Sequence, residues 1–134
     1  DFEDLVRYTT QLVEAKDDIG TKLRGMFDHV LVDEYQDTND TQNRMVSAFA
    51  DKKNICVVGD DDQVLYSWRG ANVSYIRDFD KAFPGAVIVK LEQNYRSTSN
   101  IVSCAIAVIS KSQTRVPKNL WILPAATACV DILT

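Results

Sequence analysis

The chain has 134 residues, 46% of them hydrophobic and 25% charged, and this composition excludes a largely disordered protein. Its net charge of −4 excludes a domain that holds nucleic acid through a broadly basic surface, so any such contact must be local. No apolar run approaches the roughly 18 residues that a membrane span needs. The chain starts at Asp1 without a methionine or a signal peptide, and we expect a cytoplasmic protein and a fragment of a longer chain.

Hydrophobic spacing predicts helices and strands that alternate along the chain. Residues 2–16 have helical spacing, and residues 27–32 form an apolar run without clean alternation, which is typical of a buried parallel strand. The elements predicted next are a helix over 41–50, a strand over 54–58, a helix over 72–83, a strand over 86–91 and a largely buried helix over 100–111. This order predicts an α/β fold, with a parallel sheet flanked by helices.

Some features carry no predicted chemistry. Gly20 and Gly25 indicate a short connection between the first helix and the first strand. Cys56 and Cys104 lie in apolar patterns and are expected to be buried, as thiols often are in proteins of a reducing cytosol. Residues 122–134 are small and apolar without a clear period, and no function is assigned to them.

The first polar cluster follows the strand predicted at 27–32. Asp33 and Glu34 stand where the chain leaves that strand, so both carboxylates can face one pocket. One such carboxylate can hold Mg²⁺ while its neighbour polarises an attacking water molecule. A solvated acidic turn is the alternative explanation, and the pair alone does not decide between the two.

The second cluster follows the strand predicted at 54–58. Three consecutive aspartates, residues 60–62, are followed by Gln63, whose neutral amide can hydrogen-bond a phosphate oxygen and sense its loss after hydrolysis. The alternative is a charged loop that caps a helix over residues 64–69, since acidic side chains stabilise helix N-termini.

An aromatic and cationic group comes directly after these residues. Tyr66 and Trp68 can stack on single-stranded bases whatever their sequence, and Arg69 can add a phosphate or cation–π contact. The alternative is that Trp68 is buried between helices while Arg69 forms a structural salt bridge.

The third cluster follows the strand predicted at 86–91. Arg96 has the planar cation that suits a transferring phosphate, and Tyr95 can stack on an adenine ring. A capping turn, with Arg96 paired to an acidic residue, is the alternative. Because the carboxyl ends of parallel strands meet at one edge of a sheet, we expect all three clusters to lie where a nucleotide would bind.

Taken together, the three clusters resemble motifs II, III and IV of the UvrD/Rep/PcrA-type superfamily 1 DNA helicases. The matching words are Val-Asp-Glu-Tyr-Gln-Asp-Thr-Asn (32–39), Val-Gly-Asp-Asp-Asp-Gln (58–63) with Tyr-Ser-Trp-Arg-Gly-Ala (66–71), and Leu-Glu-Gln-Asn-Tyr-Arg-Ser-Thr (91–98). The resemblance implies a partial RecA-like P-loop NTPase fold. Residues 1–90 would form the C-terminal part of the first lobe and residues 91–121 the start of the second, followed by a divergent tail over 122–134.

The resemblance also implies roles in ATP hydrolysis, with ATP and Mg²⁺ as cofactors. Asp33 would hold Mg²⁺ and Glu34 would be the general base. Gln63 would sense the γ-phosphate and link the ATP site to the DNA groove. Tyr95 would pack on the adenine, and Arg96 would act as an arginine finger.

The implied partners are single-stranded DNA, duplex junctions and the other lobes of a full-length helicase, with no membrane. Tyr66 and Trp68 would stack on single-stranded bases, with Arg69 supporting their loop. Such motors move 3′→5′ along a strand, and a bacterial member would be associated with the nucleoid.

The sequence departs from the family pattern in ways that limit the expected activity. It contains no Gly-x-x-x-x-Gly-Lys-[Ser/Thr], the loop that cradles phosphates, so we expect the isolated chain to be inactive. Val64-Leu65-Tyr66 stands where the family usually has Ser-Ile-Tyr. One alternative is a truncated, non-catalytic module that binds single-stranded nucleic acid or docks on a partner. Another is an unrelated acidic Mg²⁺-dependent phosphohydrolase or nuclease built on Asp33, Glu34 and the aspartates 60–62. It leaves Gln63, the aromatic run 66–69 and the pair 95–96 unexplained.

Overall fold

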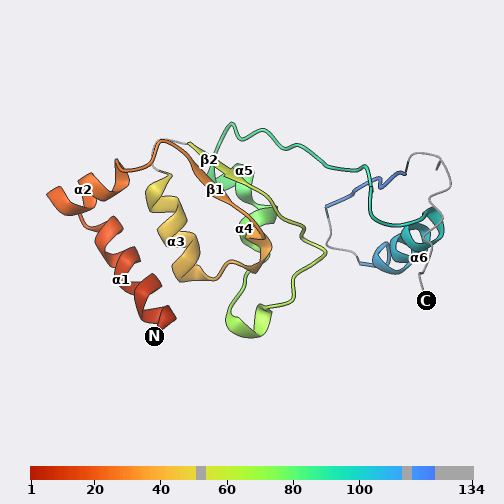
Figure 1. Cartoon of the computed structure of the whole chain (residues 1–134), viewed down its shortest axis with the longest axis horizontal. Helices are drawn as coiled ribbons and strands as arrows, with labels where there is room; N and C mark the ends of the chain where they lie inside the picture. The colour runs from red at the N-terminus through yellow and green to blue at the C-terminus, as the bar shows by residue number, and fades with distance from the viewer. Residues whose placement is uncertain (51–53, 113–115, 123–134) are drawn as a thin grey trace, which may run out of the picture. The chain divides into compact units, whose positions relative to one another are not determined.

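The computed structural model describes residues 1–50, 54–112 and 116–122, and its elements are labelled in Figure 1. The chain divides into two compact units, Asp1–Val87 and Ile88–Thr134. Of the divergent tail predicted over 122–134, only Ile122 lies within the described residues. No helix among the described residues is long and apolar enough to cross a membrane.

Three helices of the first unit pack on one another (Figure 1), and these are α1 (Phe2–Glu14), α2 (Asp18–Arg24) and α3 (Asp40–Phe49). The amphipathic α1 buries Val13 and Thr10, and the Thr10 hydroxyl donates a hydrogen bond across to a carbonyl at the start of α3. Arg44 of α3 pairs with Glu14 of α1 through two nitrogen–oxygen contacts. The N-terminal helix predicted from spacing is therefore confirmed, and α3 is its packing partner.

Helix α2 occupies the segment that the glycines predicted to be a connection. Asp17 caps it, because its side chain accepts a hydrogen bond from the Gly20 N–H at 2.8 Å. A Cβ atom on Gly20 would lie 2.0 Å from the carbonyl oxygen of Ala15, so glycine is needed here for close packing against the end of α1. The guanidinium of Arg24 also donates to that carbonyl at 2.9 Å. The predicted connection was wrong, because Gly20 allows close packing of a helix and Gly25 ends it.

The sheet of the first unit consists of two parallel strands, β1 (Val30–Val32) and β2 (Ile55–Val57). Val30 is opposite Ile55 and Val32 is opposite Val57, and these four side chains are partly covered. On the other face Leu31 is 78% exposed, and its partner Cys56 is exposed too. The two predicted strands and their parallel pairing are confirmed, but the expected burial of Cys56 is wrong.

The helix predicted over 72–83 is divided into α4 (Ser74–Arg77) and α5 (Phe79–Ala82). The break falls at Asp78, whose backbone leaves the helical region at φ −106° and ψ 21°. Aspartate is a weak residue inside helices because its short side chain favours local polar partners, and here it accepts a hydrogen bond from Lys81. The apolar spacing correctly predicted helical structure in this segment, but it does not reveal the interruption at Asp78.

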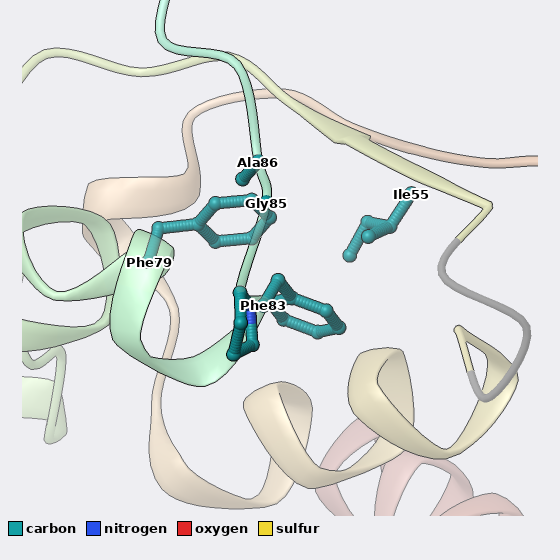
Figure 2. A pocket seen from close by; sticks show the side chains of 6 residues that line it. Ile55, Phe79, Phe83, Gly85 and Ala86 are labelled. Atoms are coloured by element: carbon teal, nitrogen blue, oxygen red, sulfur yellow. The ribbon is translucent and has the colours of Figure 1, made fainter.

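An apolar pocket of about 110 Å³ lies beside the start of β2, where Ile55 faces the rings of Phe79 and Phe83 (Figure 2). The two rings stack with their centroids 4.7 Å apart. Pockets for small-molecule ligands generally measure about 300–1,000 Å³. This pocket is smaller, is apolar, and lies at the amino end of β2, so it is not the nucleotide site that the polar clusters predict.

The second unit contains α6 (Ser99–Ile109) and an isolated parallel bridge between Gln93 and Trp121. Among the residues of α6, only Val102 is buried, whereas Ile101, Val108 and Cys104 are exposed. The predicted helix is confirmed. Its expected burial is wrong, because an apolar pattern shows what could be buried and not whether a partner covers it.

The strand predicted over 86–91 is not formed. The side chains of Val87, Ile88, Val89 and Leu91 are exposed. A strand requires hydrogen bonds from a neighbour, and within the described part of the chain the ladder comprises β1 and β2 alone. The β-branched composition favours an extended chain, but pairing depends on residues distant in the sequence.

Candidate functional site

The first polar cluster lies at a sharp turn immediately after β1. Tyr35 N–H donates to the carbonyl of Val58 at 3.0 Å, which keeps the ends of the two strands together. Between them Glu34 adopts the left-handed conformation, with φ 49° and ψ 42°, and its N–H donates to Asp33 Oδ1 at 2.9 Å. Such a conformation is uncommon for a residue other than glycine. Both acidic side chains are exposed, and the expected turn at the end of the strand is present.

The two carboxylates differ in their surroundings. Asp33 uses one oxygen to accept the neighbouring amide and has an exposed side chain, so its second oxygen can be offered to a hard cation such as Mg²⁺. Glu34 accepts a hydrogen bond at Oε2 from the side-chain nitrogen of Gln36 at 2.6 Å. The donor set at this turn therefore fits a metal ligand beside an oriented carboxylate.

Gln36 joins the first cluster to the second. Its side chain is buried, with 1% of the residue exposed, and its Oε1 accepts the backbone N–H of Asp60 at 3.0 Å. The same carboxamide donates to Glu34, so one side chain bridges the two strand ends. Sequence reasoning assigned this glutamine no role. The sequence did hold one signal for it. Gln36 lies two residues after Glu34, in a turn that the strand pattern places beside the second cluster.

The aspartates of the second cluster form a tight turn and have different partners. The Asp60 carboxylate accepts hydrogen bonds from the backbone N–H of Asp62 at 3.0 Å and from the side-chain nitrogen of Gln63 at 2.8 Å. Asp61 is buried and forms an ion pair with Arg77. Carboxylate oxygens of the three aspartates lie within 4.8 Å of one another, which is metal-ligand spacing. Because Asp61 is paired with an arginine, this aspartate cluster is a poorer candidate for a metal site than the exposed Asp33.

The aromatic group lies on a loop around the 3₁₀ turn η2 (Ser67–Arg69), in place of the helix considered over 64–69. Trp68 is 72% exposed and Tyr66 is also exposed. The guanidinium carbon of Arg69 lies 4.6 Å from the centre of the Trp68 ring and 5.8 Å from that of Tyr66. Burial of Trp68 between helices is therefore excluded, and the loop presents two rings and a cation together.

The turn after β1 also holds this aromatic loop in place. The N–H of Leu65 donates to Asp37 Oδ1 at 3.3 Å, and the N–H of Asn72 donates to the carbonyl of Thr38 at 3.1 Å. Gly70 ends η2 with φ 85°. Asp37 is part of the 3₁₀ turn η1 (Tyr35–Asp37), so one short segment contacts both the aspartate turn and the aromatic loop.

Burial of Tyr35 anchors η1 in the core of the first unit. Its ring meets Phe79 edge to face with centroids 5.8 Å apart, and its hydroxyl donates to Asn43 Oδ1 at 2.6 Å. Burial raises the pKa of Tyr35, and the neighbouring Tyr75 adds to this shift. The phenol thus stays neutral and can serve as a hydrogen-bond donor at physiological pH.

The third cluster belongs to the second unit, where it forms a turn before α6. Asn94 Oδ1 accepts the backbone N–H groups of Arg96 and Ser97 at 3.0 and 2.8 Å. Tyr95 is 84% exposed and its hydroxyl donates to Gln93. The structure thus brings together the first and second clusters, whereas Tyr95 and Arg96 lie in a separate unit and follow no strand.

Comparison with known proteins supplies an independent finding. A family model described as the UvrD/REP helicase N-terminal domain matches residues 1–84. Over 122 residues, 90% of this chain and 16% of the relative, the sequence is 49% identical to the ATP-dependent DNA helicase PcrA of Leuconostoc citreum. Identity over the same length is 44% with PcrA of Bacillus subtilis strain 168 and 46% with PcrA of Staphylococcus aureus strain Mu50. The chain spans about a sixth of the length of these relatives.

Proposed function

The chain belongs to the UvrD/REP helicase family, and from this premise we propose that it is a segment of an ATP-dependent DNA helicase motor. The whole motor hydrolyses ATP, moves 3′→5′ along single-stranded DNA and unwinds duplexes. Residues 1–90 are assigned to the first RecA-like lobe and residues 91–121 to the start of the second. The observation that carries this proposal is the buried Gln36 bridge, since it joins the catalytic carboxylate to the turn that bears Gln63.

Asp33 and Glu34 divide the hydrolytic work in this proposal. Asp33 holds Mg²⁺, which neutralises charge on the transferring phosphate when it is bound. Glu34 accepts a proton from the attacking water, a role that requires a carboxylate held in a fixed position. The exposure of both side chains and the hydrogen bond from Gln36 to Glu34 support this division.

Three further residues complete the ATP site of the proposed motor. Gln63 senses the γ-phosphate, and its hydrogen bond to Asp60 gives it a defined resting position. Tyr95 packs on the adenine, and Arg96 is the arginine finger that stabilises charge in the transition state. Both side chains are exposed in the second unit, so each is accessible to a nucleotide, which supports these roles.

A chimera tests this function. The 122-residue segment of the Bacillus subtilis relative that aligns with this chain is replaced by the present sequence. We expect DNA-stimulated ATP hydrolysis and unwinding of a duplex with a 3′ tail but not of one with a 5′ tail. Glu34→Gln should then lower kcat by about 10²–10⁴-fold, the usual contribution of a general base. Glu3→Gln, at an exposed position of α1, is the matched control. A chimera that folds but keeps its kcat after Glu34→Gln would exclude the proposed base.

The isolated 134-residue chain is expected to have no ATP turnover, because its sequence lacks the glycine loop and lysine that hold the β- and γ-phosphates. A steady-state phosphate-release assay, with and without single-stranded DNA, checks this. Turnover that is lost on Asp33→Asn would contradict the expectation.

The exposed aromatic loop favours a second function for the isolated chain, weak binding of single-stranded nucleic acid. Tyr66 and Trp68 offer rings to unpaired bases, and Arg69 lies against both rings. Because the chain carries a net charge of −4, such binding would rest on stacking and a few cations and not on bulk attraction.

A further inference from the structure

Gln36 has a buried carboxamide whose orientation is set by its two partners. The backbone N–H of Asp60 can only donate, so the atom that faces it at 3.0 Å must be the carbonyl oxygen Oε1. The nitrogen Nε2 then faces Glu34 Oε2 at 2.6 Å, where it meets an acceptor. Burying an amide without partners is costly, and here both ends of the amide are satisfied.

The strand ends do not depend on this side chain to stay together. Val58 N–H donates to the carbonyl of Val32 at 2.8 Å, and Tyr35 N–H donates to the carbonyl of Val58 at 3.0 Å. An apolar residue at position 36 could fill the same buried volume. The feature that only a carboxamide supplies is the simultaneous hydrogen bonding of Glu34 and Asp60.

The neighbouring backbone leaves room for this carboxamide. A Cβ atom on Gly59 would lie 2.5 Å from Gln36 Oε1, a distance that real Cβ contacts essentially never show. The glycine before Asp60 therefore allows the amide to approach the aspartate turn, and both clusters contribute to the bridge.

We propose that Gln36 is a positioning residue that fixes the Glu34 carboxylate and links it to the turn carrying Gln63. This inference rests on the proposed function, in which Glu34 is the general base. Glu34 is exposed, so without a partner its long side chain would sample several rotamers. The Gln36 hydrogen bond to Oε2 selects one of them and does not use Oε1 of Glu34.

The same bridge connects the base to the phosphate-sensing residue. Gln63 donates to the carboxylate of Asp60, the Asp60 N–H donates to Gln36, and Gln36 donates to Glu34. A displacement of the turn when Gln63 engages a phosphate would therefore move the carboxylate through three consecutive hydrogen bonds. Gln36 thus adjusts catalysis without contacting the substrate.

A double-mutant cycle in the chimera tests the positioning role. Gln36→Met keeps the length of the side chain and removes both hydrogen bonds, and Gln11→Met at an exposed position of α1 is the matched control. We expect Gln36→Met to lower kcat about 10–100-fold, the scale of a small misplacement, while the KM for ATP stays within about twofold. In a Glu34→Gln background, single-turnover rates should change less than about twofold on adding Gln36→Met, because the group being positioned is absent.

Each outcome of the cycle decides the inference. An equal loss in both backgrounds, or an unchanged kcat for Gln36→Met, overturns the positioning role, whereas a Glu34→Gln variant with full kcat overturns the proposed function itself. If Gln36→Met lowers the melting temperature of the chimera below the assay range, Gln36→Leu replaces it. That variant also fills the buried volume without a hydrogen bond to Glu34 or Asp60, and it should show the same loss of kcat and the same non-additivity.

Discussion

The carboxylate of Asp37 accepts a hydrogen bond from the backbone N–H of Leu65 at 3.3 Å, which ties the turn after β1 to the start of the aromatic loop. A second hydrogen bond, from the Asn72 N–H to the carbonyl of Thr38, connects the same turn to the other end of that loop. The segment that bears the proposed catalytic carboxylates thus also determines where Trp68 is presented. In the proposed motor, movement of this segment on nucleotide binding would reach the aromatic loop through these two contacts.

Asp37→Ala should weaken binding of single-stranded DNA by the 134-residue chain. Without the hydrogen bond to Leu65 the loop backbone is less ordered, and DNA binding must order it again. Ordering one residue costs about 1 kcal/mol, which raises Kd about fivefold. Fluorescence anisotropy with a labelled oligonucleotide measures the effect. Asp37→Asn is the control for charge, because it removes the carboxylate charge yet keeps an acceptor. If Ala and Asn bind alike, the hydrogen bond does not order the loop.

Trp68→Ala should reduce oligonucleotide affinity by about 1–3 kcal/mol, the typical contribution of one stacked base. Trp68→Phe should retain most of the affinity, since stacking needs a ring and not an indole nitrogen. Trp121→Ala serves as the matched tryptophan control, because that side chain is half exposed but lies in the second unit, away from the aromatic loop in sequence. Equal affinities for the wild type and Trp68→Ala would exclude stacking by this residue.

The parts of the fold that follow from local periodicity could be predicted from the sequence. The two parallel strands and the long helices have apolar spacing that matches their secondary structure. The strand predicted over 86–91 depended on a partner distant in the sequence, and periodicity carries no information about pairing. The break at Asp78 was missed because one side chain that favours a local partner ends a helix whose apolar stripe continues.

The candidate site likewise contains residues that could be predicted from the sequence and residues that could not. Asp33, Glu34 and Gln63 could be proposed because carboxylates and amides after parallel strands meet at one sheet edge. Gln36 and Asp37 could not be proposed in this way, because their hydrogen bonds depend on which backbone amides lie beside them in three dimensions. The exposure of Trp68 was also undecidable from sequence, since tryptophans occur both in cores and on binding surfaces.

Gly59→Ala should destabilise the chain by about 1–3 kcal/mol, the usual cost of forcing atoms into a filled site. Its Cβ would meet Gln36 Oε1 at 2.5 Å and Ile76 Cδ1 at 2.8 Å, so at least one of them must move. Gly25→Ala is the matched control, because its Cβ would meet ordinary contacts of 3.5 Å and longer. Urea unfolding monitored by circular dichroism compares the two, and equal stabilities would show that the turn relaxes freely.

The ion pair between Glu14 and Arg44 should make stability depend on acid pH. The hydrogen bond from Arg44 lowers the pKa of Glu14 below its ordinary value of 4.5. A depressed folded-state pKa contributes stability that is present above the unfolded pKa and lost as the pH falls through the folded pKa. The wild type should thus be more stable than Glu14→Gln at pH 7, with the difference shrinking as the pH falls below about 4.5. Urea midpoints across this range test it, and a constant difference would contradict it.

Removing Arg77 should cost more than removing a similar cation at the surface. Asp61 has a side chain only 3% exposed, and its carboxylate meets Arg77 Nε at 3.1 Å, whereas the Arg77 side chain is 27% exposed. Arg77→Met leaves a buried carboxylate without its arginine and should lower the free energy of unfolding by about 1–3 kcal/mol, less than for a fully buried pair. Lys81→Met, which breaks the exposed pair with Asp78, should have little effect. Adding Asp61→Asn to Arg77→Met should recover part of the loss, because the buried negative charge is then gone. Urea unfolding measures all four proteins, and a double variant less stable than Arg77→Met would show that the charge is not the source of the penalty.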